Sequence, residues 1–189
     1  MKAAATRNLL LFAAFAVGGC LVDLLTKSWV FRRLGMPHEQ PSWWLVGENF
    51  GFTTSLNEGA LFGIGQGQGL VFSTLSLVAI AGIGYWLFVV GAVEDRWLTV
   101  ALGAVTGGIL GNLYDRLGLP GLNWQAHAFH ERGEPVFAVR DWLHFKIDGL
   151  VDWPIFNIAD SLLVCGAALL IWHAMRVAPA PQRAELLDK

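Results

Sequence analysis

The feature that most constrains the fold of this chain is a set of four long apolar runs. The hydrocarbon core of a bilayer is about 30 Å thick, so a helix needs roughly 20 mostly apolar residues to cross it. Four stretches meet this requirement, at about residues 9–30, 70–93, 97–114 and 154–175. Unpaired backbone groups are costly in lipid, so we predict four transmembrane helices, with Pro154 at the first position of the fourth.

The composition supports a membrane protein. Of the 189 residues, 54% are hydrophobic and 15% are charged, whereas a soluble domain carries about 25% charged residues. The net charge of −2 offers no basic surface for a nucleic-acid partner. The two cysteines, Cys20 and Cys165, lie in apolar runs without a CxxC motif, and we expect both to be small buried hydrophobes.

Four spans place both termini on one side of the membrane and two long connections, about residues 31–69 and 117–153, on the other. The first connection is rich in aromatic and turn residues and predicts a small β-rich cap. The expected fold is therefore a four-transmembrane-helix bundle, all-α in the membrane, with this cap and a second loop. Residues 1–176 are predicted to form one domain, and the tail 177–189 to be disordered. Six of the 13 Lys and Arg residues lie on the side of the termini and seven on the other side. The distribution of positive charge therefore does not indicate the orientation in the membrane.

The N-terminus also resembles a secretory signal with a lipoprotein cleavage box at Val17–Cys20. The apolar stretch continues beyond Cys20, however, and three more spans follow. We therefore interpret this segment as the first transmembrane helix.

Three polar clusters lie at span ends on the side of the long connections. Charged groups within a membrane cost several kcal/mol by the lower scales and so suggest function. Each cluster has i, i+3, i+4 spacing, which places its members on one helix face. The clusters are Asp23, Thr26 and Lys27; Asn112, Asp115 and Arg116; and Asn157, Asp160 and Ser161. Their convergence on one side predicts a polar site there.

Each cluster also has a structural interpretation. Asp23 and Lys27 could neutralise each other as an i, i+4 pair, and Arg116 could snorkel from an ordinary span end. Asn157 and Asp160 could cap the fourth helix. Asp160 is nevertheless expected about six residues inside the fourth span, roughly 9 Å along its axis, and this depth favours function.

The third span contains small residues at close spacing. Gly103, Gly107, Gly108 and Gly111 form two overlapping GxxxG patterns. Small residues at this spacing let helices approach closely. We expect them to draw the third span against its neighbours and to bring the polar clusters together.

Five segments, in order along the chain, resemble the motifs of one family, the lipoprotein signal peptidases (type II signal peptidases). Any one segment would be a weak match, but five spread over four spans are specific. The segments are Asp23–Lys27, Asn57–Gly63, Gly107–Arg116, Val139–Trp142 and Pro154–Ser161.

The resemblance implies an aspartyl endopeptidase of the bacterial inner membrane that acts without metal or cofactor. Such enzymes cut prolipoproteins immediately before a cysteine that carries a diacylglyceryl group. The implied catalytic residues are Asp141 and Asp160. The implied substrate-binding residues are Asn57, Asn112, Arg116 and Asn157, and the implied structural supports are Asp23, Lys27, Gly59 and Asp115.

The family also implies partners and orientation. The expected partners are lipid-modified prolipoproteins and membrane lipids, with globomycin-type compounds as inhibitors and the chain acting as a monomer. The active site is expected at the periplasmic face, with both termini in the cytoplasm.

Two departures from the family pattern surround Asp141. An insert of 24 residues separates it from Arg116, more than is usual. Arg140 stands where the family has a small apolar residue. Asp148 and Asp152 therefore remain alternatives, although the Val-x-Asp-aromatic context favours Asp141.

Two other functions are compatible with parts of the sequence. A zinc peptidase could use His127, His130 and Glu131 of the insert, but their order matches neither H-E-x-x-H nor H-x-x-E-H. A transporter or channel could use the intramembrane charges, but its polar groups should extend through the membrane depth. The preferred lipoproteins, the role of the insert at 117–139 and the oligomeric state are not indicated.

Overall fold

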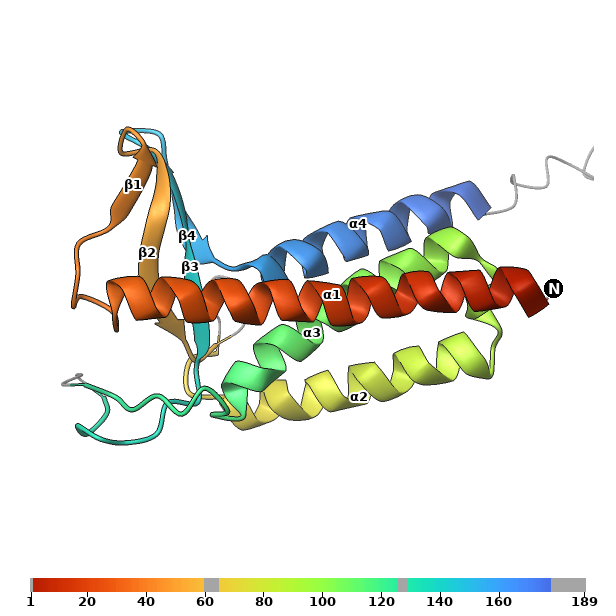
Figure 1. The fold of residues 1–189 in the computed structure, drawn as a ribbon, viewed down its shortest axis with the longest axis horizontal. Coiled ribbons are helices and arrows are strands. Elements are labelled where there is room, and N and C mark those ends of the chain that lie inside the picture. The colour runs from red at the N-terminus through yellow and green to blue at the C-terminus, as the bar shows by residue number, and fades with distance from the viewer. Residues whose placement is uncertain (1, 60–64, 126–128, 178–189) are drawn as a thin grey trace, which may run out of the picture.

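The structure is a computed structural model that describes residues 2–59, 65–125 and 129–177. Its helices are α1 (Lys2–Leu34), α2 (Gly69–Phe88), α3 (Arg96–Arg116) and α4 (Ile158–Val177), with a short 3-10 turn, η2, at Ala92–Glu94. Its strands are β1 (Trp43–Val46), β2 (Phe50–Asn57), β3 (Val139–Ile147) and β4 (Val151–Phe156). The helices form a bundle, and the strands form a sheet at one end of it, opposite the N-terminus (Figure 1).

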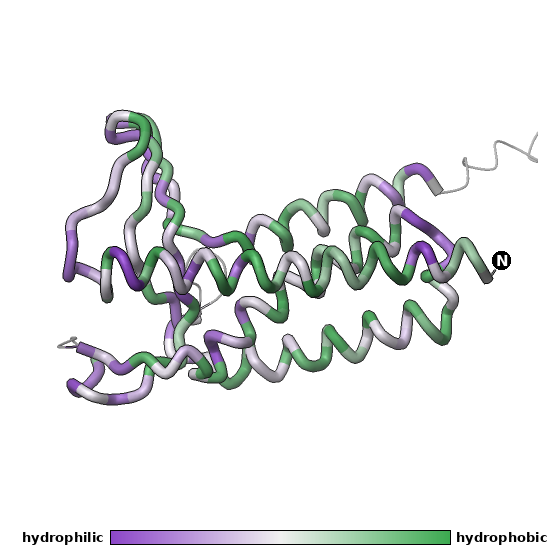
Figure 2. Tube along the Cα trace, in the orientation of Figure 1, coloured by the Kyte–Doolittle hydropathy of each residue, from purple (hydrophilic) through white to green (hydrophobic). Residues whose placement is uncertain are grey.

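All four α-helices are long and apolar enough to cross a membrane, as predicted. Apolar residues follow each of them along its length (Figure 2). Many of these residues face outward: Leu10 is 67% exposed, Leu70 is 82% exposed and Ile171 is 62% exposed. A soluble monomer rarely exposes such continuous apolar surface. The chain is therefore a membrane protein whose helices turn these side chains to lipid, and Cys165, which we expected to be buried, is exposed as well.

Helix α3 is the centre of the bundle and packs closely because of its glycines. A Cβ atom built on Gly107 would lie 2.8 Å from the carbonyl oxygen of Phe15, and one on Gly108 would lie 2.5 Å from that of Ala159. Both distances are too short for a real side chain, so only glycine permits these contacts with α1 and α4. The predicted close approach of the third span to its neighbours is confirmed.

The sheet combines both long connections. Its strands are antiparallel in the order β1-β2-β3-β4, with β1 and β2 from the first connection and β3 and β4 from the second. The predicted β-rich cap was therefore too small, because the second connection also pairs. In the β2–β3 register, Ser55 lies opposite Asp141 and Asn57 lies opposite Val139. This pairing brings two motifs distant in sequence side by side.

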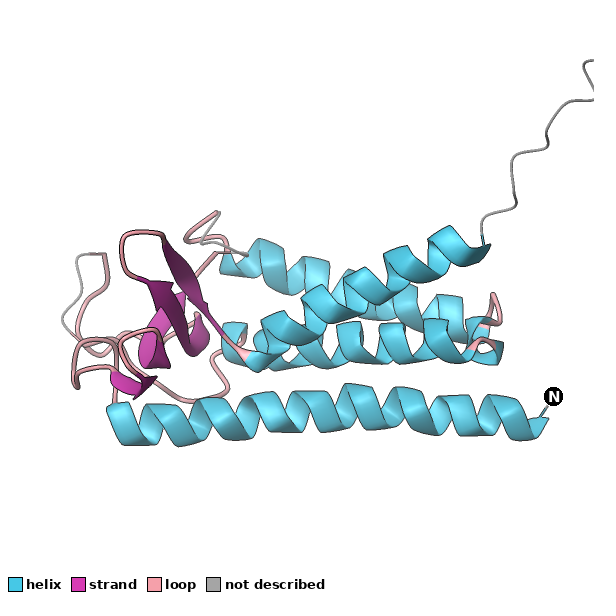
Figure 3. Cartoon of the chain, turned by 90° about the horizontal axis from the view of Figure 1, so that it is seen from above, coloured by secondary structure: helices cyan, strands magenta, loops and turns pink. Residues whose placement is uncertain are grey.

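A cluster of buried apolar side chains joins the sheet to the end of α1. It consists of Val30, Phe31, Leu34, Trp142 and Leu143. Figure 3, turned by 90°, shows the sheet at the C-terminal end of α1. The start of α2, the end of α3 and the start of α4 lie at this same end of the bundle (Figure 1). The position of the strand that carries Asp141 is thus set by apolar packing against a membrane helix.

The start of the fourth helix differs from the prediction. Pro154 lies in strand β4, and α4 begins only at Ile158. Strand β4 is at the sheet edge, where a residue without an N–H is tolerated. Asp160 therefore lies in the first turn of α4, not six residues inside it. The other spans also shift: α1 runs from Lys2 to Leu34, and α2 ends at Phe88.

We expect Gly107→Val to destabilise the protein, because the new side chain would clash with backbone atoms of α1. Unlike a side chain, these backbone atoms cannot relieve the clash by rotating away. Overpacking of this kind costs about 1–3 kcal/mol. Thermal unfolding in detergent micelles measures the loss. Gly84→Val on α2 is the matched control, because a Cβ atom there has no heavy atom within 4 Å. Equal midpoints for the two variants would contradict the proposed packing.

Candidate active site

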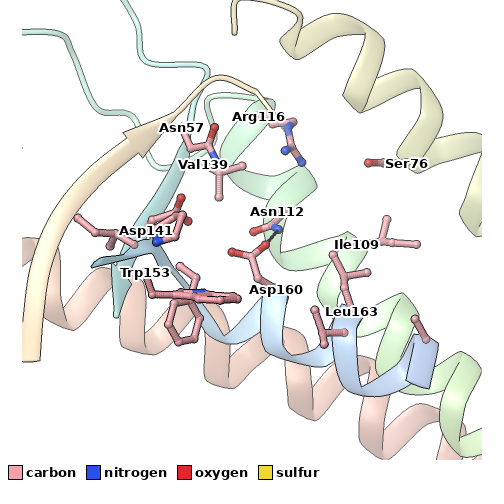
Figure 4. A pocket seen from close by; sticks show the side chains of 15 residues that line it. Asn57, Ser76, Ile109, Asn112, Arg116, Val139, Asp141, Trp153, Asp160 and Leu163 are labelled. Carbon is pink, nitrogen blue, oxygen red and sulfur yellow. Dashed lines mark hydrogen bonds between the residues drawn. The ribbon is translucent and has the colours of Figure 1, made fainter. Parts of the chain in front are cut away.

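A cavity of about 370 Å³ lies where the sheet meets the ends of α3 and α4. Five residues predicted for the site line it: Asn57, Asn112, Arg116, Asp141 and Asp160. Figure 4 shows these side chains directed toward one another from strands β2 and β3 and helices α3 and α4. Apolar side chains form much of the remaining wall: Ile109, Val139, Trp153, Ile155, Phe156, Leu163 and Val164.

Asp160 is held by the start of its own helix. Its N–H donates to Oδ1 of Asn157 at 2.9 Å, and its Oδ2 accepts from the N–H of Asn157 at 3.2 Å. This reciprocal pair is a capping box, in which the residue before a helix and the third residue within it satisfy each other's backbone donors. The interpretation that the two residues cap α4 is therefore correct. Asp160 in addition lines the cavity.

Asn157 also connects the two aspartates. Its Nδ2 donates to Oδ1 of Asp141 at 2.6 Å, while its backbone and carboxamide oxygen hold Asp160. Asn157 is fully buried, and its single side chain spans the space between the two carboxyl groups. The aspartates thus face one cavity on either side of a common hydrogen-bonding partner.

Asp141 is in an environment that disfavours its charge. The residue is only 2% exposed. The pKa of its carboxyl group is raised from 3.8 to about 8, chiefly by burial and then by the neighbouring charge of Asp160, although Lys27 and hydrogen bonds from Asn157 and Asn57 offset part of the rise. At neutral pH, therefore, Asp141 retains its proton and can donate a hydrogen bond.

Asn112 has a fixed orientation that serves Asp160. Its Oδ1 accepts from Nζ of Lys27 at 2.9 Å, and its Nδ2 donates to Oδ1 of Asp160 at 2.8 Å. Because the ammonium group can only donate, it determines which end of the Asn112 amide turns toward the cavity. Both carboxyl oxygens of Asp160 thus accept a hydrogen bond, Oδ1 from Asn112 and Oδ2 from the N–H of Asn157.

A buried ionic network lies behind the cavity. Nζ of Lys27 is 2.7 Å from Oδ2 of Asp23 and 3.0 Å from Oδ2 of Asp115, and all three side chains are inaccessible to solvent. Asp115 also accepts from the backbone N–H of Arg140 at 3.1 Å and from its Nε at 2.9 Å. Two buried anions thus meet two buried cations, which limits the cost of removing four charges from water.

This network joins four elements. Asp23 and Lys27 are on α1, Asp115 is on α3 and Arg140 is on β3. Oδ1 of Asp23 accepts from the N–H of Ala159 at the start of α4, at 2.9 Å. Asp23, Lys27 and Asp115, which were predicted to be structural supports, therefore lie behind the cavity without lining it. They connect α1 with three of the elements that carry cavity residues, namely α3, β3 and α4.

Arg116 connects α3 to the segment after β2. Its NH2 group donates to the carbonyl oxygen of Gly59 at 2.9 Å, and the N–H of Gly59 donates to Oδ1 of Asn57 at 2.9 Å. Gln66 adds a longer contact with Oδ1 of Asn57 at 3.4 Å. Arg116 is thus attached to the backbone near Asn57 and is not a snorkelling span end.

The alternative site residues lie elsewhere. Asp148 and Asp152 are exposed at the β3–β4 hairpin, with side chains 78% and 73% accessible, and neither lines the cavity. His130 contacts Glu58 and Glu134 outside the cavity, and His127 lies outside the described residues. Within the described part of the chain, no group of three His, Cys, Asp or Glu side chains could hold a metal ion.

Two features of the site were not predicted from the sequence. Arg140 was noted only as a departure, yet it is the second cation of the buried network. Trp153 forms part of the cavity wall (Figure 4), and no spacing rule pointed to it. Pairing of β4 beside β3 brings it there, opposite Phe145 in the register.

Comparisons with known proteins identify the family of the chain. Residues 15–176 match the family described as signal peptidase (SPase) II. A lipoprotein signal peptidase of Rhodopirellula baltica is 46% identical over 166 residues, covering 85% of this chain and 70% of the relative. One of Bacillus pumilus is 37% identical over 151 residues, covering 80% and 83%.

Solved structures agree in fold. A bacterial membrane enzyme structure determined in meso at 2.3 Å matches with a TM-score of 0.71 and 24% identity, over 96% of this chain and 94% of that one. A second bacterial membrane enzyme structure, determined in meso at 1.9 Å, matches with a TM-score of 0.67 and 26% identity. The match covers 91% of this chain and 94% of that one.

We expect Arg140→Ala to destabilise the protein strongly, because it leaves an excess negative charge in the buried network. Removing one partner of a buried pair costs about 3–5 kcal/mol. Thermal unfolding in detergent measures this loss, with Lys146→Ala on the same strand as the control. Adding Asp115→Asn should recover part of the stability, since the charges of the remaining ion pair, Asp23 and Lys27, cancel each other. A double variant as unstable as the sum of both singles would contradict the pairing.

Proposed function

The chain belongs to the signal peptidase II family, and on that premise we propose that Asp141 and Asp160 are its catalytic pair. The family consists of membrane proteases, aspartic in type, that remove signal peptides from prolipoproteins. The observation that carries the proposal is the shared cavity, where two aspartates from separate elements contact one buried asparagine. The proposed cut is on the N-terminal side of a cysteine that carries a diacylglyceryl group.

In the proposed reaction the two aspartates have different roles. Asp141 is protonated at neutral pH because burial raises its pKa to about 8. Its O–H donates to the carbonyl oxygen of the scissile bond. Asp160, whose two oxygens accept hydrogen bonds from Asn112 and Asn157, removes a proton from a water molecule, and the water oxygen attacks the carbonyl carbon. Asp160 then passes this proton to the amine of the cysteine as the C–N bond breaks, which leaves the signal peptide with a new carboxyl group.

The other cavity residues bind or position the substrate in this proposal. Asn112 and Asn157 orient the carboxyl groups, as their hydrogen bonds indicate. Asn57 and Arg116 line the opposite part of the cavity (Figure 4) and offer an amide and a guanidinium group to the peptide. Asp23, Lys27, Gly59 and Asp115 support this arrangement from behind. The proposed mechanism involves neither a metal ion nor a cofactor.

The cavity is placed for a substrate that remains in the membrane. Its lining includes Ser76 on α2 and Val164 on α4, and Val164 is 56% exposed on the apolar outer surface. We infer that the signal helix and the acyl chains stay in lipid while only the peptide bond enters. The proposed orientation places the sheet in the periplasm, with both termini and the tail at 177–189 in the cytoplasm. In this view, residues 1–176 form a single peptidase domain that acts as a monomer and binds globomycin-type inhibitors.

Asp141→Asn and Asp160→Asn should each abolish cleavage, because each removes a group that transfers or shares a proton while its size is retained. A loss of about a thousandfold or more is expected from such catalytic groups. A gel-shift assay with a lipid-modified prolipoprotein measures processing, and its unmodified form tests the lipid requirement. Asp148→Asn and Asp152→Asn are matched controls at exposed positions of the same hairpin. Normal processing by the Asp141 or Asp160 variant would refute the pair.

Cleavage should also decrease at alkaline pH. The pKa of Asp141 is raised from 3.8 to about 8, so its acidic proton is present below that pH and is lost above it. The single-turnover rate should therefore fall about tenfold per pH unit once pH exceeds the pKa. Rates measured between about pH 6 and pH 10 test this, with thermal unfolding at each pH as the control. A rate that keeps rising throughout this range would contradict a protonated Asp141.

A further inference from the structure

Strand β2 is longer than its outer neighbour. Strand β1 pairs only with residues Phe50 to Phe52 of β2. Beyond them, Thr54, Ser55 and Leu56 have β3 on one side and, among the described residues, no strand on the other. An unpaired strand edge presents free N–H and C=O groups that can bind another extended chain. This short edge is one strand away from Asp141.

The backbone groups of Leu56 point toward that edge. Leu56 lies opposite Arg140 in the β2–β3 register, but the N–H of Arg140 donates to Asp115 and not across to β2. In an antiparallel ladder, the residues of such a pair direct their N–H and C=O groups away from each other. The N–H and C=O of Leu56 therefore face outward, as a partner strand would require.

A slot runs along this edge. Its two connected hollows, of about 510 and 370 Å³, share Pro37, His38 and Ser55. One hollow borders β2 at 53–55, and the other borders it at Ser55 and Leu56 and continues to Glu58, just after the strand. At the β1 end, a 2.7 Å hydrogen bond from Thr53 to Ser42 closes the slot. We call this feature the edge slot.

The edge slot adjoins the catalytic cavity. Ile155 of β4 lines both, and Ser55 lies opposite Asp141 across one pair of strands. A peptide bound at Asp141 therefore reaches the slot after crossing only β2, at Ser55.

We propose that the edge slot binds the mature segment of the substrate, the residues after the lipidated cysteine, as an added strand on β2. This inference rests on the proposed function and names a second contact for the same substrate. Main-chain hydrogen bonds supply affinity in strand addition. They do not depend on side chains, and this suits a peptidase that acts on prolipoproteins as a class.

Main-chain recognition predicts alternating sensitivity in the substrate. Successive residues of a strand point their N–H groups to opposite sides, so only every second N–H of the mature segment would contact β2. A synthetic lipopeptide with one N-methyl group at a time tests this, and the unmethylated lipopeptide is the positive control. Methylation at alternate positions should raise KM on the order of tenfold, equivalent to one lost hydrogen bond.

The outcomes separate this inference from the proposed function. If the unmethylated lipopeptide is cleaved and methylation has no effect, or acts equally at adjacent positions, strand addition is wrong and the peptidase remains. Failure to cleave the unmethylated lipopeptide would instead contradict the proposed function itself.

A second test fills the slot from the enzyme side. His38 is exposed and lines both hollows, so His38→Trp should obstruct the slot without touching the catalytic pair. We expect KM for a lipopeptide with a long mature segment to rise about tenfold, with kcat unchanged. Leu150→Trp is the control, since it places the same ring at the hairpin tip, where Leu150 is 79% exposed.

A truncated substrate makes this test decisive. A lipopeptide that ends directly after the cysteine cannot reach the edge slot, so His38→Trp should cleave it as the wild type does. The wild type should in turn bind it more weakly than the long lipopeptide. Equal KM values for long and truncated lipopeptides with the wild type would overturn the proposal.

Discussion

The buried ammonium group of Lys27 is the contact on which the rest of the site depends. It meets Asp23, Asp115 and Asn112 within 3.0 Å, so each of its three N–H groups has an acceptor. Asp23 in turn holds the start of α4 through the N–H of Ala159. Three membrane helices thus converge on one charge, and its removal would leave carboxylates buried without a partner.

The sheet completes the site because it joins connections that are distant in sequence. Strand β3 carries Asp141 and is attached to α3 by Arg140 and to α1 by apolar packing. Strand β2, beside it, contributes Asn57. The aspartate from the sheet and the aspartate from α4 are therefore placed independently, and Asn157 contacts both. Their environments differ, since Asp141 is enclosed and its pKa is raised to about 8, and different environments allow different chemical roles.

The outer surface explains where such a site can act. Helices α1, α2 and α4 expose apolar side chains over much of their length, while α3 is enclosed by glycine-mediated contacts. Hydrophilic residues occur at both ends of the bundle (Figure 2), but the buried ionic network and the cavity residues lie at the sheet end. A transporter would need polar or charged residues along the whole path across the membrane. A hydrolase at the membrane boundary needs them only at the boundary where it cleaves its substrate.

The sequence by itself determined the four spans and the candidate site residues on the helices, because apolar runs and i, i+4 polar spacing reflect local helix geometry. Asn57 and Asp141, which lie in the connections, were indicated only by the resemblance to the family. It did not indicate strands β3 and β4, since Pro154 and the apolar residues after it were equally compatible with a helix start. It also left Arg140 as an unexplained departure. Only the tertiary structure decided that Arg140 balances Asp115 and that, among the residues it describes, no strand pairs with the outer edge of β2 beyond Phe52. Strand pairing and buried charge balance depend on residues far apart in the chain, which local patterns do not encode.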